Sequence, residues 1–281
     1  RGRVPVRSVA SAEAEQADGK ALSWHRTETL PWTESVAGPE HKLLYMPFVE
    51  WQLGFMRENM DLQDLPFDPT FSFQNSTVKP AVIESWQFQS EYFRKIRLTY
   101  IDAGTQAQVY NCVFYPRYEF DIPIFGIDFL QFGKKKVLAI LDLQPLEQSP
   151  EYLEKYIDPL IPIRNKYEDL CGRMSSKFYD EVRFFSRQLL FGRFDSDAPV
   201  MESLFPAFQD YMQHYMDLVR STKPNSDSAF VKRVRQLQKD YDTYSAEKDP
   251  AVGLFSTYWG QEWAHNFMYE FLFADAEPPA V

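Results

Sequence analysis

Hydrophobic and polar residues follow two different periods along the chain. From residue 81 to residue 146, apolar residues alternate with polar ones or form short apolar runs, which indicates β-strands. Turn-forming pairs such as Ala103-Gly104 and Gly133-Lys134 separate these strands, and such short connections leave no room for crossover helices. The pattern therefore predicts an antiparallel meander. Its strands are expected at residues 82–89, 93–102, 107–115, 122–132 and 136–143.

Apolar residues at helical spacing mark the segments on either side of this strand region. An amphipathic stretch over residues 45–60 predicts a helix, and residues 61–80, rich in Asp, Pro, Ser and Asn, predict a loop. An antiparallel sheet with late helices covering its faces is an α+β layered fold rather than a doubly wound one. The late helices are expected at residues 151–170, 206–221, 228–248 and 260–273.

The N-terminal segment differs in composition from the rest of the chain. Several arginines and serines precede Glu13, the first acidic residue, as at the trailing end of an organelle transit peptide; a disordered tail is the alternative. A chain of 281 residues can bury a sizeable core without division. We therefore expect a tail over residues 1–38 and a single domain over residues 39–281.

Net charge and cysteine usage exclude several classes of protein. The formal net charge is −10 and no basic stripe is interleaved with aromatic residues, so nucleic-acid binding is not expected. No apolar run approaches the roughly 20 residues that span a bilayer, so we expect a soluble protein. Cys112 and Cys171 lie far apart without a CxxC motif, which favours a reducing compartment and packing roles.

The sequence lacks the usual motifs of enzymes that carry their own cofactor. It contains no G-x-G-x-x-G, Walker loop, G-x-S-x-G or H-E-x-x-H motif, and its four histidines are scattered. Phe, Tyr and Trp make up 16% of the chain, which suits a thick core or a pocket for a flat conjugated ligand. A self-contained nucleotide, flavin or metal enzyme is therefore not expected.

One carboxylate stands in an unusual place, because Asp128 interrupts an apolar run over residues 122–130 that has the character of a buried strand. An ionised carboxylate is costly to bury alone, so Asp128 must be paired, face a cavity or keep its proton through a raised pKa. Such a carboxylic acid is a proton donor near neutral pH. The structural alternative is an aspartate that points to solvent from a one-sided sheet.

Two further polar residues are candidates for the same site. If the segments around Asn111 and Asp128 pair through the turn at residues 117–121, strand alternation allows both side chains to share one face of the sheet. Asp249 precedes Pro250, and an aspartate before proline is ordinarily a turn residue or a helix N-cap. The local sequence leaves open whether Asp249 has only this structural role or also belongs to the site.

These same stretches resemble a known family, the ferredoxin-dependent bilin reductases. The likeness covers roughly residues 82–273, and several long matches in one order are more specific than one short motif. The branch favoured is the one that reduces biliverdin to 15,16-dihydrobiliverdin in phycoerythrobilin synthesis. The matching segments are IESWQF, FRKIRLTYIDAG, VYNCVFYPRYEFDIPIFGIDFLQFG, KVLAILDLQPL, DYDTYSAEKDPAVGLF and YWGQEW followed by FMYEFLF.

The resemblance implies a three-layer α/β/α sandwich, with a central antiparallel β-sheet flanked by helices and a bilin pocket between the sheet and the C-terminal helices. It also implies that reduced ferredoxin delivers single electrons, that the bound bilin carries the radical, and that side chains supply protons. No bound cofactor or metal is then needed. A soluble plastid (chloroplast) monomer is expected, with handover of product to the next bilin reductase as a further expectation.

Matched by position, Asp128 corresponds to the central proton-donating aspartate of the family, and Asp249 corresponds to its second aspartate. Asn111 and Thr99 stand where the phycocyanobilin-forming branch has a histidine and a catalytic glutamate. Both departures favour a two-electron reduction at the 15,16 methine bridge. The resemblance thus implies that Asp128, Asp249 and Asn111 bind the bilin, with the aspartates as proton donors and Asn111 orienting the ligand.

Docking of ferredoxin sets a further requirement. Ferredoxins are generally acidic, so a chain of charge −10 needs a local basic patch. Each basic set in the sequence is also typical of a solvated surface. The candidate sets are Lys134 to Lys136; Arg94, Lys95 and Arg97; and Lys232, Arg233 and Arg235.

Other functions stay open at this level. One is a related bilin reductase that makes phycoerythrobilin, from dihydrobiliverdin or in two steps. Another is a non-catalytic bilin carrier or lyase, for which two retained aspartates are unnecessary. A soluble interaction protein with an aromatic core is a third.

Overall fold

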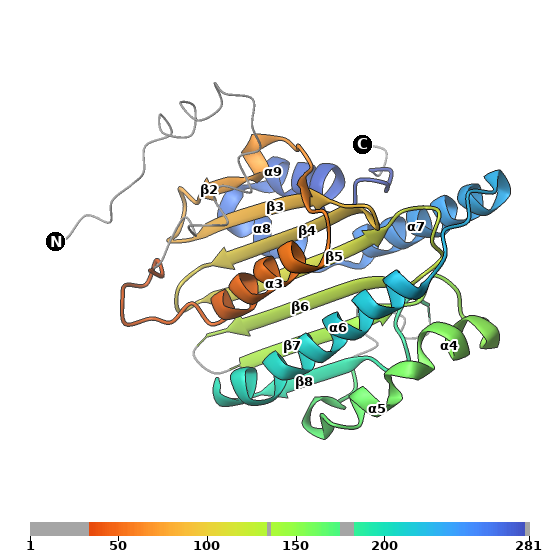
Figure 1. Ribbon diagram of the computed structural model, residues 1–281. Coiled ribbons are helices and arrows are strands. Elements are labelled where there is room, and N and C mark those ends of the chain that lie inside the picture. Colours follow the sequence, from red (N-terminus) through yellow and green to blue (C-terminus); the bar gives the residue numbers. More distant parts are fainter. Residues whose placement is uncertain (1–33, 134–135, 175–182, 279–281) are drawn as a thin grey trace.

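An eight-stranded sheet runs through the middle of the computed structural model, which describes residues 34–133, 136–174 and 183–278 (Figure 1). The strands follow the order β1-β3-β4-β5-β6-β7-β8, β2 also pairs with β3, and every neighbouring pair is antiparallel. The meander predicted from residues 82–143 is confirmed. The strands are β1 Gln63–Asp64, β2 Phe73–Asn75, β3 Val82–Gln89, β4 Phe93–Asp102, β5 Ala107–Pro116, β6 Ile124–Phe132, β7 Lys136–Gln144 and β8 Leu190–Phe194.

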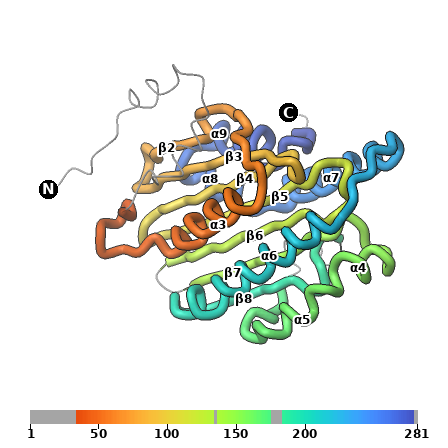
Figure 2. Tube along the Cα trace, in the orientation of Figure 1, coloured from red at the N-terminus to blue at the C-terminus, as the bar shows by residue number. Residues whose placement is uncertain are grey.

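Helices cover both faces of the sheet, so the three-layer α/β/α sandwich is confirmed. Figures 1 and 2 show α3 (Met46–Asn59) and α6 (Phe205–Ser221) on one face, and α7 (Ser228–Lys248), α8 (Ala251–Trp259) and α9 (Gln261–Asn266) on the other. Shorter helical segments complete the chain. They are η2 Pro69–Phe71, α4 Pro150–Tyr156, η3 Asp158–Leu160, α5 Ile161–Arg164, η4 Glu168–Leu170, η5 Val200–Leu204 and η6 Phe267–Leu272.

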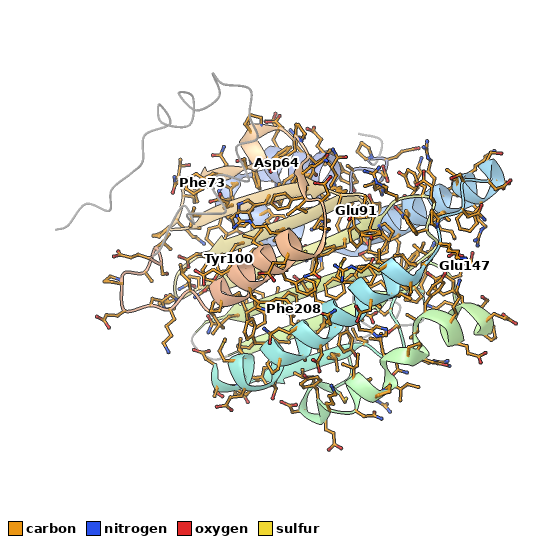
Figure 3. The ribbon with its side chains drawn as sticks, in the orientation of Figure 1. Asp64, Phe73, Glu91, Tyr100, Glu147 and Phe208 are labelled. Atoms are coloured by element: carbon orange, nitrogen blue, oxygen red, sulfur yellow. The ribbon has the colours of Figure 1, made fainter. Side chains whose placement is uncertain are left out.

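The layer between the sheet and the helices α3 and α6 is the aromatic core. The ring centroid of Phe129 in β6 lies 5.3 Å from that of Phe48 in α3 and 6.1 Å from that of Phe208 in α6. Figure 3 labels Phe208 and Tyr100, which are both fully buried at this layer. Each such aromatic pair contributes about 0.5–1.5 kcal/mol beyond its buried area. Part of the high aromatic content therefore serves packing on the face opposite the site described below.

The helix predicted over residues 151–170 is wrong, because the structure divides this segment into α4, η3, α5 and η4. Pro159 and Pro162 lie within it, and a proline both lacks the backbone N–H and clashes with the preceding helical turn. The helices predicted over residues 45–60, 206–221 and 228–248 are confirmed as α3, α6 and α7. The one predicted over residues 260–273 forms as α9 followed by η6.

Some elements escaped the sequence pattern. The predicted loop over residues 61–80 contains the short strands β1 and β2 and the turn η2, and neither β8 nor α8 was predicted. Near the predicted tail, the hydroxyl of Ser35 and the backbone N–H of Val36 donate to the carboxylate of Asp102, at 3.1 and 2.7 Å. Residues 1–33, with the arginines and serines of the predicted transit peptide, lie outside the described residues. None of the described helices combines the length and the apolar character needed to cross a bilayer.

Candidate active site

Asn111 of β5 and Asp128 of β6 lie directly opposite each other in the antiparallel register. The Nδ2 group of Asn111 donates a hydrogen bond of 3.2 Å to Oδ1 of Asp128. Asn111 is the one partly exposed residue of β5, and Asp128, also partly exposed, follows four buried residues in β6. The predicted pairing and the predicted shared face are therefore confirmed, and the apolar run around Asp128 is interrupted because that carboxyl faces a pocket.

Asp249 reaches the same pocket from the connection between α7 and α8. Its Oδ1 atom accepts the backbone N–H of Ala251 at 2.8 Å, so the carboxylate caps the start of α8. Asp249 also lines the pocket together with Asn111 and Asp128. The interpretation as a cap is thus confirmed, and the structure places Asp249 in the pocket lining, while its role as a site residue stays a prediction.

The pocket lies between β4, β5, β6 and β7 on one side and α7 with the C-terminal segment on the other. Its cavity volume is about 60 Å³, and it opens to solvent. Apolar and aromatic walls surround a few polar groups, which is typical of sites for organic ligands. Its lining residues are Arg97, Asn111, Val113, Gly126, Ile127, Asp128, Ile140, Gln144, Phe184, Phe185, Tyr241, Tyr244, Ser245, Asp249 and Phe273.

Arg97 lines this pocket, although the sequence analysis assigned it to a docking patch and not to the site. Its Nη1 group donates to Oδ1 of Asn111 at 2.5 Å, and its Nε group donates to the carbonyl oxygen of Leu272 at 2.9 Å. The sequence contained a usable signal, because Arg97 lies two residues before Thr99, and Thr99 pairs with Asn111 across β4 and β5. Alternation then puts Arg97 and Asn111 on one face.

The electrostatics of the pocket favour protonated carboxyl groups. The pKa of Asp128 is raised to about 7, mainly by burial and also by the neighbouring charge of Asp249, while the hydrogen bond from Asn111 and the charge of Arg97 oppose the rise. Burial likewise raises the pKa of Asp249, and the hydrogen bond from the Ala251 N–H and the charge of Arg97 oppose this rise. Two carboxyl groups near each other thus hold protons more readily than ordinary aspartates, which is a feature of acid–base sites.

Gly126 shapes one wall of the pocket. A Cβ atom at this position would lie 2.5 Å from Oε1 of Gln144, which accepts the hydroxyl of Tyr241 at 2.6 Å. The close approach of the Gln144 side chain therefore explains the glycine in strand β6. Gly126 lies two residues before Asp128 on the same face of that strand.

Comparison with known proteins adds the family to this geometry. A sequence profile described as ferredoxin-dependent bilin reductase matches residues 53–274. The chain belongs to the ferredoxin-dependent bilin reductase family. A protein of Nostoc punctiforme named 15,16-dihydrobiliverdin:ferredoxin oxidoreductase is 47% identical over 240 residues, which cover 85% of this chain and 98% of that protein. A protein of Gloeobacter violaceus with the same name is 44% identical over the same shares of the two chains.

A solved structure shows the same fold. Phytochromobilin synthase from tomato, crystallised in complex with biliverdin, matches this bilin reductase with a TM-score of 0.76 and 28% identity. The match covers 82% of this chain and 83% of the tomato protein.

The basic sets proposed for ferredoxin docking differ in exposure and in ion pairing in the structure of this bilin reductase. The set Arg94, Lys95 and Arg97 is wrong as a docking patch, because Lys95 and Arg97 are buried and Arg94 is paired with Asp275 at 2.7 Å. Lys134 and Lys135 lie outside the described residues. The set Lys232, Arg233 and Arg235 is exposed on α7, although Arg233 is paired with Glu147 and Asp121.

Other reactive groups of this bilin reductase lie away from the pocket. His41 contacts the carbonyl oxygen of Gly104 at 3.0 Å, and the ring of His265 packs on Tyr269. Cys112 and Cys171 are free thiols. Across residues 34–133, 136–174 and 183–278, no group of three or more His, Cys, Asp or Glu side chains is arranged to hold a metal ion.

Proposed function

We propose that this bilin reductase catalyses the two-electron, ferredoxin-dependent reduction of biliverdin IXα at the 15,16 methine bridge, giving 15,16-dihydrobiliverdin. Relatives that match 85% of the chain are named for this product, and the tomato relative binds biliverdin. The observation that carries the proposal is one pocket in which Asp128 and Asp249, both with raised pKa values, lie beside Asn111.

The number of acidic groups matches the reaction. Saturation of one carbon–carbon double bond takes two electrons and two protons, and ferredoxin supplies the electrons one at a time. Among the described residues that line the pocket, Asp128 and Asp249 are the two that carry a carboxyl group. A carboxyl group with a pKa near 7 is protonated in a large fraction of molecules at neutral pH and regains its proton from solvent readily.

In the proposed mechanism, protonated Asp128 donates a hydrogen bond or its proton to the bound bilin, which raises the electron affinity of the pigment. The first electron from ferredoxin then gives a bilin radical, and the proton from Asp128 is delivered to the methine bridge or the neighbouring ring carbon. A second electron and a second proton, with Asp249 as the donor or relay, complete the reduction. Asn111 orients the ligand, because an amide has no acidic proton to give.

The surroundings of Asn111 support a two-electron rather than a four-electron reaction. Thr99 pairs with Asn111 across the strands, is buried, and contacts the hydroxyl of Ser85 at 3.2 Å. A hydroxyl group at this position supplies no third acid.

The proposal also includes a single catalytic domain over residues 39–281, a plastid location, a monomer and product handover to a further reductase, which rest on the sequence and on the family resemblance.

The proposed function is tested by anaerobic turnover of the purified protein with biliverdin, reduced ferredoxin and a ferredoxin-reducing system, followed by product chromatography. Accumulation of 15,16-dihydrobiliverdin is the expected result. Phycoerythrobilin as the product would instead assign both reduction steps to this chain. A change in biliverdin absorbance without turnover would leave a bilin carrier.

A further inference from the structure

Arg97 has contacts that the mechanism above does not use. The side chain is only 1% exposed although it lines the pocket. Its Nε group is bonded to the carbonyl oxygen of Leu272 at 2.9 Å, its Nη1 group is bonded to Oδ1 of Asn111 at 2.5 Å, and its guanidinium carbon lies 5.2 Å from the ring centroid of Phe273. One end of the guanidinium is thus anchored in the C-terminal segment, and the other end points at the residue that contacts Asp128.

The contact with Arg97 fixes the side-chain amide of Asn111. A guanidinium donates hydrogen bonds and accepts none, so the amide oxygen must face Arg97. The amide NH₂ group then faces Asp128, where it donates to Oδ1 at 3.2 Å. Without Arg97, the amide could turn over and present its oxygen to a protonated Asp128, since an asparagine side chain both donates and accepts.

This orientation decides which oxygen of Asp128 can carry the acidic proton. An N–H group of Asn111 points at Oδ1, so Oδ1 serves as an acceptor, and a proton on that oxygen would be directed against the N–H. We propose that Arg97 is a positioning residue that acts through Asn111, and that it keeps the acidic proton of Asp128 on Oδ2, the oxygen left for the ligand. The inference rests on the proposed function only for the identity of that ligand.

The anchor of Arg97 is itself held in place. The Nζ group of Lys95, on the same strand, donates to the carbonyl oxygen of Phe271 at 2.5 Å. The hydroxyl of Tyr115 donates to Oδ1 of Asp242 at 2.7 Å, and Oδ2 of Asp242 accepts the backbone N–H of Asp275 at 3.0 Å in the same C-terminal segment. Lys95 and Arg97 of β4 thereby fix the C-terminal segment at two successive carbonyl groups, which restricts the guanidinium to one position.

Arg97 can influence Asp128 in two ways, which an experiment has to separate. The charged groups that act on the pKa of Asp128 are Arg97 from β4 and Asp249 from the connection after α7. The charge of Asp128 in turn raises the pKa of Tyr45, which immediately precedes α3. Loss of Arg97 removes a positive charge and also frees the amide of Asn111. Only the second effect passes through Asn111, so it disappears when Asn111 is replaced.

Two substitutions of Arg97 each keep one of its hydrogen-bond contacts and remove the other. In Arg97→Gln the amide nitrogen takes the place of Nε, so the bond to Leu272 is kept and the bond to Asn111 is lost. In Arg97→Lys the ammonium takes the place of the guanidinium carbon, so a charged donor toward Asn111 is kept and the bond to Leu272 is lost. Thermal unfolding identifies any variant that does not fold.

The first experiment measures the rate of biliverdin reduction in a double-mutant cycle. Arg97→Gln should reduce the rate by about tenfold or more, Arg97→Lys should retain most of it, and Arg97→Gln should cost less than about threefold in an Asn111→Leu background. If the rate losses of Arg97→Gln and Asn111→Leu multiply in the double variant, the proposal is overturned, since Arg97 would then act by its charge or by touching the bilin. A wild-type rate for Arg97→Gln would overturn it as well.

The second experiment needs no turnover, so it stays valid if the proposed function fails. Infrared spectra of the ligand-free protein at acidic pH show the C=O stretch of protonated Asp128, which is identified by its loss in Asp128→Asn. With the proton on Oδ2, the carbonyl oxygen is Oδ1, and its bond from Asn111 lowers the stretching frequency. The band should therefore move to higher frequency in both Asn111→Leu and Arg97→Gln. A band that stays in place in Asn111→Leu would show the proton on Oδ1 and overturn the proposal, whether or not any Arg97 variant folds.

Discussion

Asn111 and Asp128 form one cross-strand pair, and the hydrogen bond of 3.2 Å between them opposes the effect of burial on the carboxyl group. Burial and the charge of Asp249 raise the pKa of Asp128, while Asn111 and Arg97 lower it. The result, a pKa of about 7, is close to the value at which a general acid works best in neutral solution. The pKa of Asp128 is therefore set by a balance of neighbouring groups that single substitutions can shift.

The first prediction concerns pH. Because the proposed reaction uses protonated Asp128, the rate should fall as pH rises through about 7. Asn111→Leu removes an interaction that lowers the pKa of Asp128, so the falling limb should move to higher pH. Initial rates at several pH values with saturating ferredoxin measure both effects. A limb that stays at the same pH in Asn111→Leu would show that another group controls the rate.

The second prediction concerns stability. The pKa of Asp128 is about 7 in the folded protein and about 4 when unfolded, so the folded state binds more protons and loses stability as pH rises from about 4 to about 7. Asp128→Asn does not titrate. The variant should melt at a higher temperature than the wild type above pH 7, with a smaller difference near pH 5. Equal effects at both pH values would contradict the raised pKa.

The third prediction concerns the pocket wall. Gly126→Ala puts a Cβ atom against Oε1 of Gln144, so the end of that side chain must move away from Tyr241 and biliverdin binding should weaken. Gly54→Ala in α3 is the matched control, because a Cβ there meets no atom within 4 Å and alanine favours a helix. Absorbance titration with biliverdin compares the two variants. Equal affinities would mean that Gln144 does not limit the space for the ligand.

The site was partly predictable because two of its residues lie on neighbouring strands of a meander. Strand alternation and a short connection suffice to bring Asn111 opposite Asp128, and the structure has that register. Asp249 is separated from them by more than a hundred residues, and its local sequence describes only the cap on Ala251. Its place in the pocket was expected from the family resemblance, since no local pattern reports which helix covers which part of a sheet.

Other features depend on tertiary contacts that the sequence pattern does not contain. Arg97 was assigned to a surface patch because three basic residues stand close together, yet the C-terminal segment covers it. Strand β8 is short and contains Gly192, so its apolar pattern is too weak to identify a strand. Pro159 and Pro162, in contrast, were visible signals against the helix predicted over residues 151–170, and the apolar spacing was given too much weight.

The most direct test of the central claim compares Asp128→Asn with Asp142→Asn. Asp142 is also buried on this sheet and its pKa is also raised to about 7, but its carboxylate accepts from Ser186 and does not line the pocket. Both variants are assayed for anaerobic reduction of biliverdin by reduced ferredoxin, after biliverdin binding and thermal unfolding have been measured. The account predicts that Asp128→Asn binds biliverdin but forms 15,16-dihydrobiliverdin at least about a hundredfold more slowly, while Asp142→Asn retains turnover. Full turnover by Asp128→Asn would contradict it.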